Sequence, residues 1–219
     1  LSFATQNHEN VIALFIYNNK NFDNQTEAQK WWVSKSLEVF KTDLSKYNIN
    51  LQIVKGDELD IFSKIKKKDN LSIYWNKVYE PDVIAKGKKI RDVFLKNEIN
   101  FKYFKGNILN EFQDVTKNDG TPFKVFTPFW RTAEQIYLSL APTKNYIVKK
   151  MNKEKTFFKN YIEPKSILPK KNWYKKFDKY WDISEKNSKK ILNDLIISKI
   201  KDYGTTRDIP SIEGTSKLS

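Results

Sequence analysis

The stretch with the clearest chemical potential is "EGTSKLS" at residues 213–219. Thr215, Ser216 and Ser219 place hydroxyl groups at positions i, i+1 and i+4. If a helix begins here, its first backbone N–H groups point the same way as these hydroxyls and create an anion site. Gly214 leaves the backbone free to turn tightly into that helix. The pattern predicts a seat for the pyrophosphate of a dinucleotide, with an ordinary helix N-cap as the alternative.

Several other chemistries are excluded by residue types that the chain lacks. Cysteine is absent, which excludes disulfides, thiolate metal sites and cysteine nucleophiles. The one histidine, His8, lies among Asn7, Glu9 and Asn10, which predicts a solvated loop position rather than a triad or a metal site. The glycine-rich dinucleotide and P-loop motifs are missing from the sequence. No side chain is therefore predicted to be a catalytic acid or base, and an enzyme of this sequence needs a cofactor.

The net charge of +14 is concentrated late in the chain. Over residues 142–203, Lys and Arg outnumber Asp and Glu by 17 to 7. A positive field of this kind suits a phosphate backbone, with an affinity that falls as salt rises. A compositional bias that enriches Lys, Asn and Ile together would give the same excess without any ligand. Charge alone therefore leaves both nucleic-acid binding and a solvated surface open.

The apolar content favours a folded protein without a membrane span. Hydrophobic residues make up 39% and aromatic residues 15% of the chain, which is enough for a packed core. The first apolar run, Val11–Tyr17, is far shorter than the roughly 20 residues that a spanning helix needs. No basic segment precedes it, so no signal peptide is expected. A cytoplasmic protein without a membrane partner is the expectation.

Strand-length apolar runs alternate with helical patterns over the first hundred residues. The strands are expected at 11–17, 49–54, 71–75 and 100–104. Helices are expected after Thr26 as N-cap, over "DELDIFSKIKKK", and from Pro81 to about residue 98. The apolar face of the first helix is expected to consist of Ala28, Trp32, Val33, Val39, Phe40, Leu44 and Tyr47. The alternation predicts an α/β fold with a parallel sheet, and the loop "WNKVYEPD" is expected at its ligand-binding carboxyl edge.

After residue 108 the alternation stops. Asp119-Gly120 is a hairpin turn signal, followed by a short β-rich run and then by a helix over residues 130–140. The proline-punctuated, lysine-rich residues 142–180 are expected to connect two domains. A last helix is expected after Ser184 as N-cap, with a glycine stop at Tyr203-Gly204. Its expected apolar face consists of Ile191, Leu192, Leu195, Ile196 and Ile200.

Four motifs in this order resemble a known family. They are "WNKVYEPDVIAKGKKI", "GTPFKVFTPFWR", "WDISEKNSKKIL" and "YGTTRDIPSIEGTSKLS". The sequence resembles the amino-terminal part of DNA photolyases of the photolyase/cryptochrome family, from near residue 1 to its end. The most specific matches are "KVFTPFWR" and the R-D-I-P and E-G-T-S-x-L-S elements, because chance agreement with all of them at this spacing is rare.

The resemblance implies a Rossmann-like α/β antenna domain with helices on both faces of a parallel sheet, over residues 1–141. It further implies a linker over 142–180 and the first helix of an all-α FAD-binding domain over 181–219. By the same resemblance the first strand of the sheet and most of the helical domain are expected to be missing. The sequence is accordingly expected to be a fragment that is truncated at both ends and inactive alone.

The resemblance also assigns roles to single residues near the end of the chain. The family places FAD phosphates on a T-S-x-L-S pattern, which is matched by Thr215, Ser216, Lys217, Leu218 and Ser219. It places a tyrosine twelve residues before this threonine against the flavin nucleotide, and Tyr203 has that position. The arginine of its R-D-x-P motif contacts DNA phosphates and matches Arg207. A salt bridge from Arg207 to Asp208 or to the linker is the alternative.

The residues of the family's antenna site are matched less completely in this sequence. By resemblance, Glu80 and Asp82 could touch a pterin, whereas Val83 and Gly87 stand where carboxylate or amide side chains are usual. The implied antenna chromophore could be methenyltetrahydrofolate, a deazaflavin or another flavin, or be absent.

The activity implied by the resemblance is light-dependent repair of cyclobutane pyrimidine dimers by electron transfer from reduced FAD. The implied partner is double-stranded DNA containing such dimers, bound by a monomer, and no metal is expected. A cryptochrome-type photoreceptor and a (6–4) photolyase are the alternatives on the same fold. A plain nucleotide-binding α/β module is the alternative from another class, but it does not explain the spacing of Tyr203, Arg207 and the terminal hydroxyls.

Overall fold

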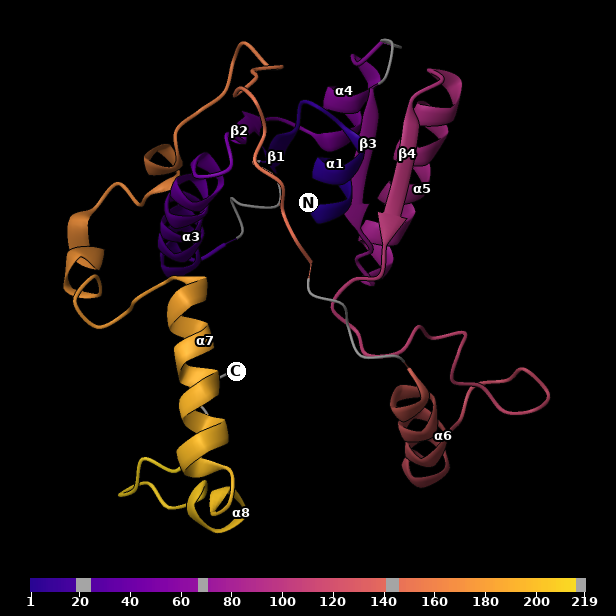
Figure 1. The fold of residues 1–219 in the computed structure, drawn as a ribbon, viewed down its shortest axis with the longest axis vertical. Coiled ribbons are helices and arrows are strands. Elements are labelled where there is room, and N and C mark those ends of the chain that lie inside the picture. Colours follow the sequence, from indigo (N-terminus) through magenta and orange to yellow (C-terminus); the bar gives the residue numbers. More distant parts are fainter. Residues whose placement is uncertain (19–24, 67–70, 141–145, 216–219) are drawn as a thin grey trace. The chain divides into compact units, whose positions relative to one another are not determined.

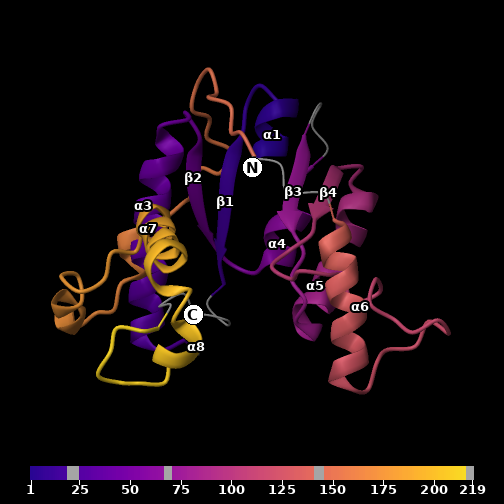
Figure 2. The same cartoon turned by 60° about the horizontal axis from the view of Figure 1, so that its bottom comes forward.

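The computed structural model describes residues 1–18, 25–66, 71–140 and 146–215, which divide into two compact units (Figure 1). Unit one combines Leu1–His8 with Gly56–Lys149, and unit two combines Glu9–Lys55 with Lys150–Ser219. Each unit contains one pair of parallel strands (Figure 2). The four predicted strands and the predicted α/β class with parallel strands are confirmed, the strands to within one residue at either end.

Unit two is built on β1 (Ile12–Tyr17) and β2 (Asn50–Lys55), joined by α3 (Glu27–Ser45). The strands pair in parallel with Ile12 opposite Asn50. Thr26 is the N-cap of α3, as predicted: its hydroxyl accepts a hydrogen bond from the backbone N–H of Gln29 in a capping box. Unit two therefore has the usual α/β order, in which the helix α3 connects the two parallel strands β1 and β2.

The buried face of α3 differs from the predicted one. Its buried residues are Trp31, Ser34, Leu37 and Leu44, so of the seven predicted positions only Leu44 is buried. Trp32 and Phe40 are each 44% exposed. The helix packs against β2 and against residues far along the chain, and these partners select a face that the apolar pattern of the helix alone does not define.

Residues 150–181, called the strap below, are fixed along β2 and α3. The side chain of Gln52, fully buried in β2, accepts hydrogen bonds from the backbone N–H groups of Phe157 and Phe158 at 2.9 and 3.0 Å. The same side chain donates to the carbonyl of Phe158 at 3.1 Å. Farther along, the N–H of Ile162 donates to the carbonyl of Ile53 at 2.8 Å. A buried amide that is satisfied by backbone groups holds the strap as a strand neighbour would.

Two short 3₁₀ helices continue the strap, η1 (Pro164–Ile167) and η2 (Asn172–Lys176). The buried hydroxyl of Ser34 in α3 donates to the carbonyl of Pro164 at 2.8 Å. The ammonium of Lys41 donates to the carboxylate of Glu163 at 2.6 Å. The strap is therefore bonded to α3 as well as to β2.

Unit one contains β3 (Ser72–Asn76) and β4 (Asn100–Phe104), joined by α5 (Pro81–Lys96). Its other helices are α1 (Ser2–Asn7), α4 (Glu58–Ser63) and α6 (Phe126–Ser139). Phe94 of α5 is fully buried and packs its ring against aromatic rings of α4, β3 and β4, namely Phe62, Trp75 and Phe101. This aromatic core holds α5 and α4 to the strand pair.

Three local features of unit one differ from the sequence predictions. The solvated position predicted for His8 is wrong, because its Nε2 lies 2.7 Å from the Tyr74 hydroxyl and the residue is half-buried. The helix predicted from residue 130 begins at Phe126 instead, since Pro128 is tolerated within its first turn. The turn at Asp119-Gly120 is present, but among the described residues only the isolated bridge between Thr116 and Pro122 represents the β-rich run.

The carboxyl-terminal part of unit two is helical and has no buried residue in any of its three helical elements. These are α7 (Glu185–Asp194), the π-helical turn η3 (Leu195–Lys199) and α8 (Tyr203–Thr206). Ser184 caps α7 as predicted, by accepting from the N–H of Asn187. The predicted glycine stop is wrong because Gly204 lies inside α8, after the preceding helix has ended through its π turn. In the described residues, no helix is both long and apolar enough to cross a membrane.

Candidate functional site

A polar cluster lies where β3 and β4 end, at the carboxyl edge of the strand pair in unit one. Its members are Lys77, Tyr79, Gly106 and Glu111, called the Glu111 cluster below. One carboxylate oxygen of Glu111 accepts from the Lys77 ammonium at 3.0 Å and from the Tyr79 hydroxyl at 3.1 Å. The N–H of Gly106 donates to the same hydroxyl at 3.1 Å. The cluster therefore fixes both loops that leave this edge.

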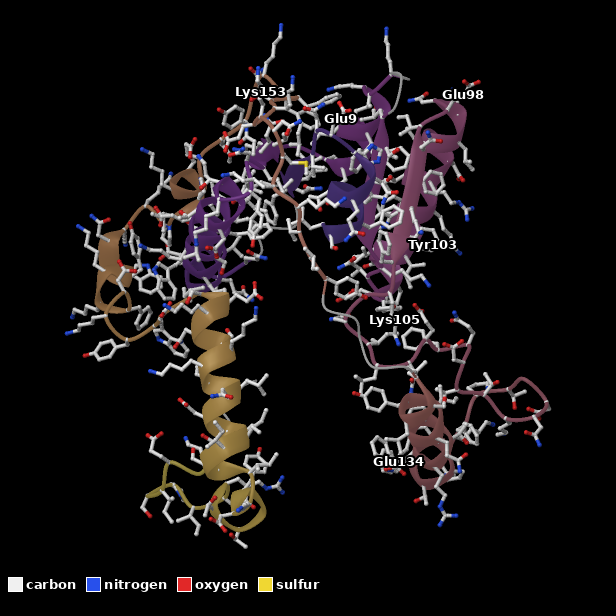
Figure 3. All side chains as sticks on the ribbon, viewed as in Figure 1. Glu9, Glu98, Tyr103, Lys105, Glu134 and Lys153 are labelled. Carbon is white, nitrogen blue, oxygen red and sulfur yellow. The ribbon has the colours of Figure 1, made fainter. Side chains whose placement is uncertain are left out.

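The glycine in this cluster is required by a close backbone approach. A Cβ atom at Gly106 would stand nearer to the carbonyl oxygen of Lys77 than real Cβ atoms approach backbone. The neighbouring backbone bond runs from the N–H of Lys77 to the carbonyl of Phe104 at 2.8 Å. Tyr103 and Lys105 project from the end of β4 beside it (Figure 3). Any side chain at Gly106 would therefore push the two loops apart.

Hydrogen bonding shifts the acid–base equilibria of the two charged members. The bond from Lys77 lowers the pKa of Glu111, and the bond from Tyr79 lowers it further. Reciprocally, the bond to Glu111 raises the pKa of Lys77. Both groups are thus held charged through the neutral range, and neither is tuned to exchange protons near neutral pH.

The two predicted antenna residues, Glu80 and Asp82, lie just beyond this cluster. Glu80 is the N-cap residue of α5 and Asp82 lies in its first turn, with Pro81 between them at the first helical position. Both carboxylates are exposed, and neither forms a hydrogen bond or ion pair within the described part of the chain. Negative charge at this helix end is favourable. The structure brings the pair together on one exposed turn, and their role toward a chromophore stays a prediction.

The predicted nucleotide residue Tyr203 and the predicted DNA residue Arg207 lie at the two ends of the four-residue helix α8 in unit two. Tyr203 is the first residue of this helix and Arg207 follows its last turn. The Arg207 guanidinium carbon lies 5.9 Å from the centroid of the Tyr203 ring. Its Nε lies 3.5 Å from a carboxylate oxygen of Asp208, with side-chain exposures of 53% and 80%. The salt bridge considered as an alternative is therefore present, but it is exposed and leaves most of the guanidinium free for an anion.

The chain then folds back against α8. Gly214 is buried, and a Cβ there would collide with the backbone of Thr206. This contact places Thr215 next to the helix that carries Tyr203, with the Thr215 side chain exposed. A hydroxyl, a guanidinium and a phenol ring around α8 are groups that can contact a nucleotide with phosphate groups, and their role toward FAD stays a prediction. The remaining predicted contacts, Ser216, Lys217, Leu218 and Ser219, lie outside the described residues.

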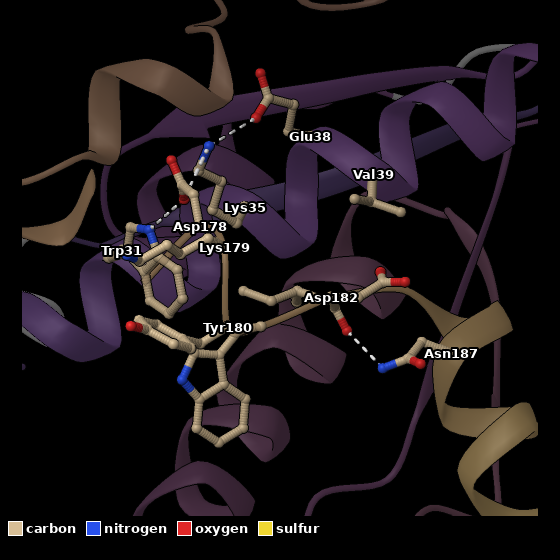
Figure 4. Close-up of a pocket in the computed structure, with 11 residues that line it drawn as sticks. Trp31, Lys35, Glu38, Val39, Asp178, Lys179, Tyr180, Asp182 and Asn187 are labelled. Carbon is tan, nitrogen blue, oxygen red and sulfur yellow. Dashed lines mark hydrogen bonds and ion pairs between the residues drawn. The ribbon is translucent and has the colours of Figure 1, made fainter. Parts of the chain in front are cut away.

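A cavity of about 660 Å³ opens between α3 and the end of the strap (Figure 4). Trp31 and Lys35 of α3 form one wall, and residues 178–183 form the other. The Trp31 indole N–H donates to Asp178 at 3.2 Å, and the Lys35 ammonium lies 3.4 Å from the same oxygen. This volume is within the range of small-molecule sites.

The sequence predictions missed both the Glu111 cluster and this cavity. A signal for the first was available, since Gly106 lies two residues after the end of a strand and a glycine near a strand end can indicate close backbone approach. For the second, the aromatic spacing of Trp173, Phe177 and Trp181 indicates one helical face. Within the described ranges, no group of three or more His, Cys, Asp or Glu side chains could hold a metal ion.

Comparison with known proteins gives a consistent result over most of the sequence. A family model described as DNA photolyase matches residues 1–147. The deoxyribodipyrimidine photo-lyase of Agrobacterium fabrum (strain C58 / ATCC 33970) is 28% identical over 197 residues, covering 88% of this chain and 40% of the relative. Cryptochrome-1 of Arabidopsis thaliana is 24% identical over 124 residues, covering 55% of this chain and 18% of the relative.

Among solved structures, a bacterial class III photolyase from Agrobacterium tumefaciens is similar in fold and sequence. It matches with a TM-score of 0.75 and 25% identity, covering 96% of this chain and 44% of that chain. The chain therefore spans less than half the length of these relatives.

Proposed function

Because the chain belongs to the DNA photolyase family, we propose that the protein is a light-dependent DNA-repair enzyme that splits cyclobutane pyrimidine dimers. The observation that carries this proposal is the family match over residues 1–147, together with a photo-lyase relative that aligns with 88% of the chain. The fold similarity to a solved photolyase extends over 96% of the chain and supports it further.

In this proposal the segment that follows α8 binds one part of FAD. Thr215, with Ser216, Lys217, Leu218 and Ser219 after it, would hold the phosphates through hydroxyl and backbone N–H groups. Tyr203 would lie against the nucleotide, and the contact of Gly214 with Thr206 would keep Thr215 beside it. When bound, FAD would supply the electron that opens the cyclobutane ring of a dimer.

The contribution of the chain itself is binding and orientation. Arg207 would contact a phosphate of double-stranded DNA, because its guanidinium is exposed and its ion pair with Asp208 is weak enough to exchange. Glu80 and Asp82 would contact an antenna chromophore, a methenyltetrahydrofolate or a deazaflavin, above the Glu111 cluster. The protein is proposed to act as a monomer.

A cryptochrome-type photoreceptor is the second candidate function. The match to Cryptochrome-1 of Arabidopsis thaliana over 55% of the chain favours it, since that relative shares the same region of sequence. The lysine excess over residues 142–203 tilts the choice slightly towards the DNA enzyme, since a phosphate backbone suits a positive field. A (6–4) photolyase shares these features and differs in the lesion that it repairs.

The deciding experiment is a repair assay with the protein expressed from its natural gene and loaded with reduced FAD. Under blue light, oligonucleotides with a single cyclobutane thymine dimer should lose the dimer, and the same mixture in the dark should not. Repair of (6–4) photoproducts alone would assign the protein to that lesion. Flavin photoreduction without repair of either lesion would contradict the proposed enzyme and favour the photoreceptor.

A further inference from the structure

Residues 170–181 at the end of the strap surround the short helix η2 and carry two chemically different sets of side chains. η2 continues into turns over residues 177–180. Its inner face, directed at α3, has helical spacing and consists of Trp173, Tyr174, Phe177, Asp178 and Trp181. The exposed side chains of residues 170–181 include Lys170, Lys171, Lys175, Lys176 and Lys179, together with Tyr180, and these six are called the outer face below.

The inner face is bonded to α3 at both of its ends. The Trp173 indole N–H donates to a carboxylate oxygen of Glu27 at 2.6 Å. The Asp178 carboxylate accepts from the Trp31 indole at 3.2 Å and lies 3.4 Å from the Lys35 ammonium. These bonds fix how the segment is turned on α3, so its outer face is presented in one orientation.

Among the residues that the structure describes, the five lysines of the outer face lack carboxylate partners, and one of them, Lys179, places its ammonium 5.0 Å from the centroid of the Tyr180 ring. All of them are exposed, and within the described residues none lies within 4.0 Å of a carboxylate. The only acidic residue of the segment, Asp178, is engaged on the inner face by Trp31 and Lys35. Lysines on a helical surface ordinarily alternate with acidic partners. A rigid, one-signed face of this kind attracts a polyanion.

Exposed aromatic rings stand beside these lysines. Tyr180 is 71% exposed and Trp181 is 56% exposed. Trp181 packs edge to face on Trp32 of α3, with ring centroids 5.6 Å apart, which holds its ring in place. Both rings border the cavity of about 660 Å³ next to α3, which is large enough for a heterocyclic base (Figure 4).

We propose that the exposed surface of residues 170–181 binds single-stranded nucleic acid, with the lysine ammonium groups of the outer face on the phosphates and an unpaired base stacked beside Tyr180 and Trp181 where these rings border the cavity. Cationic grooves that combine lysines with exposed aromatic rings bind unpaired strands in this way, and stacking requires bases that are free of a duplex. The surface needs neither flavin nor a lesion, so it extends beyond the proposed repair reaction.

The same chemistry distinguishes this partner from two other polyanions. An anionic membrane would use the lysines but would give no preference among nucleic acids. A duplex would engage the lysines but keep its bases stacked away from Tyr180. The test therefore measures fluorescence anisotropy of labelled oligothymidylate and oligouridylate with the 219-residue chain in the dark without flavin, and compares a duplex and phosphatidylserine vesicles.

The expected result is tighter binding of both single strands than of the duplex, with an affinity that falls steeply with salt. Replacing all five outer-face lysines by Gln should reduce the slope of log K against log salt concentration by about 3.5, because each phosphate contact on a single strand contributes roughly 0.7. The matched control replaces five exposed lysines of unit one, none paired with a carboxylate in the described chain, and should change little. These are Lys88, Lys89, Lys96, Lys117 and Lys124.

Stacking is tested separately from charge. Tyr180→Ala should weaken oligothymidylate binding roughly tenfold, whereas Tyr180→Phe, which keeps the ring, should leave it unchanged. Equal losses from the two lysine sets, equal affinity for single strand and duplex, or binding to vesicles alone would each overturn the proposal. Lysine acetylation with mass spectrometry gives an independent measure: oligothymidylate should protect the outer-face lysines selectively. Uniform protection, which an unfolded chain would also give, counts against it.

Discussion

The strap and the helical residues 185–206 that follow it differ in a way that helix content would not suggest. The strap has little regular structure but is held firmly by the rest of unit two, whereas residues 185–206 are helical but are held by few contacts. The strap has only two 3₁₀ turns, yet the side chain of Gln52 and the carbonyl of Ile53 hold its backbone. Residues 185–206 are almost continuously helical, yet none of their side chains is buried. Long-range bonds, rather than local helicity, therefore determine which part of unit two resists opening.

The apolar face of the later helical elements illustrates the second case. Leu192, Ile196 and Ile200, three members of the predicted apolar face, are 44%, 53% and 55% exposed. Helical propensity and the Ser184 cap give such a segment its form, but marginal helices gain most of their stability from packing. The contrast with the strap can be tested by removing matched groups from the two regions.

The largest difference is expected for aliphatic side chains. The side chain of Leu44 in α3 is 1% exposed. Leu44→Ala should lower the free energy of unfolding of the protein by about 3 kcal/mol, because the substitution leaves a buried cavity. The matched change Ile196→Ala should cost no more than about 0.5 kcal/mol, because that side chain is already hydrated. Urea unfolding followed by tryptophan fluorescence measures both. Similar costs would mean that Ile196 packs in solution, and the contrast would fail.

The next effect concerns the amide that fixes the strap. Gln52→Leu should cost about 2 kcal/mol, since it leaves the N–H groups of Phe157 and Phe158 without their acceptor. Gln135→Leu, on an exposed position of α6, is the control and should change the unfolding midpoint little. Limited proteolysis should additionally cut the Gln52→Leu strap before residues 185–206. If wild type and variant are cut at the same rate within the strap, Gln52 does not fix it.

Much of the framework could be predicted from sequence because its signals are local. The strands are short apolar runs, and Thr26 and Ser184 cap their helices through residues three positions away. The buried face of α3 could not be predicted, because its partners include Pro164, 130 residues from Ser34. Periodicity identifies an amphipathic helix, but only the partner decides which residues are covered.

The candidate site residues also include some whose proximity the sequence predicts and some whose proximity it does not. Tyr203 and Arg207 are one helical turn apart, so their proximity follows from sequence once α8 exists. The Glu111 cluster depends on the pairing of β3 with β4, which brings Gly106 against Lys77 over a long separation. Sequence patterns do not encode that register directly, so the glycine after β4 could indicate a close backbone approach but could not identify Glu111 as a partner of Lys77 and Tyr79.

A smaller effect is expected for the hydroxyl that joins α3 to η1. Ser34 is 2% exposed, and Ser34→Ala should cost about 1 kcal/mol by leaving the carbonyl of Pro164 unsatisfied. Ser188 in α7 also donates to a backbone carbonyl, that of Ser184, but both groups there are exposed to water. Ser188→Ala should therefore leave the urea midpoint unchanged. A larger loss for Ser188 than for Ser34 would reverse the ordering of the two regions.

The smallest effect belongs to the ion pair of α7. Lys189 donates to Glu185 at 2.6 Å, which raises the pKa of Lys189 above its usual 10.5, and the two side chains are 74% and 75% exposed. The stabilisation that accompanies a raised lysine pKa is fully present below the pKa of the unfolded state, and it is lost as pH rises through the pKa of the folded state. No change of stability from this pair is therefore expected near neutral pH. Because salt screens exposed pairs, Lys189→Gln should lower helicity measured by circular dichroism slightly at low salt and not at high salt.

Lys41→Gln, which releases Glu163 of the strap, should shift the urea midpoint at both salt concentrations. If both variants respond to salt alike, the Lys41–Glu163 pair contributes no more to holding the strap than Lys189–Glu185 contributes to α7.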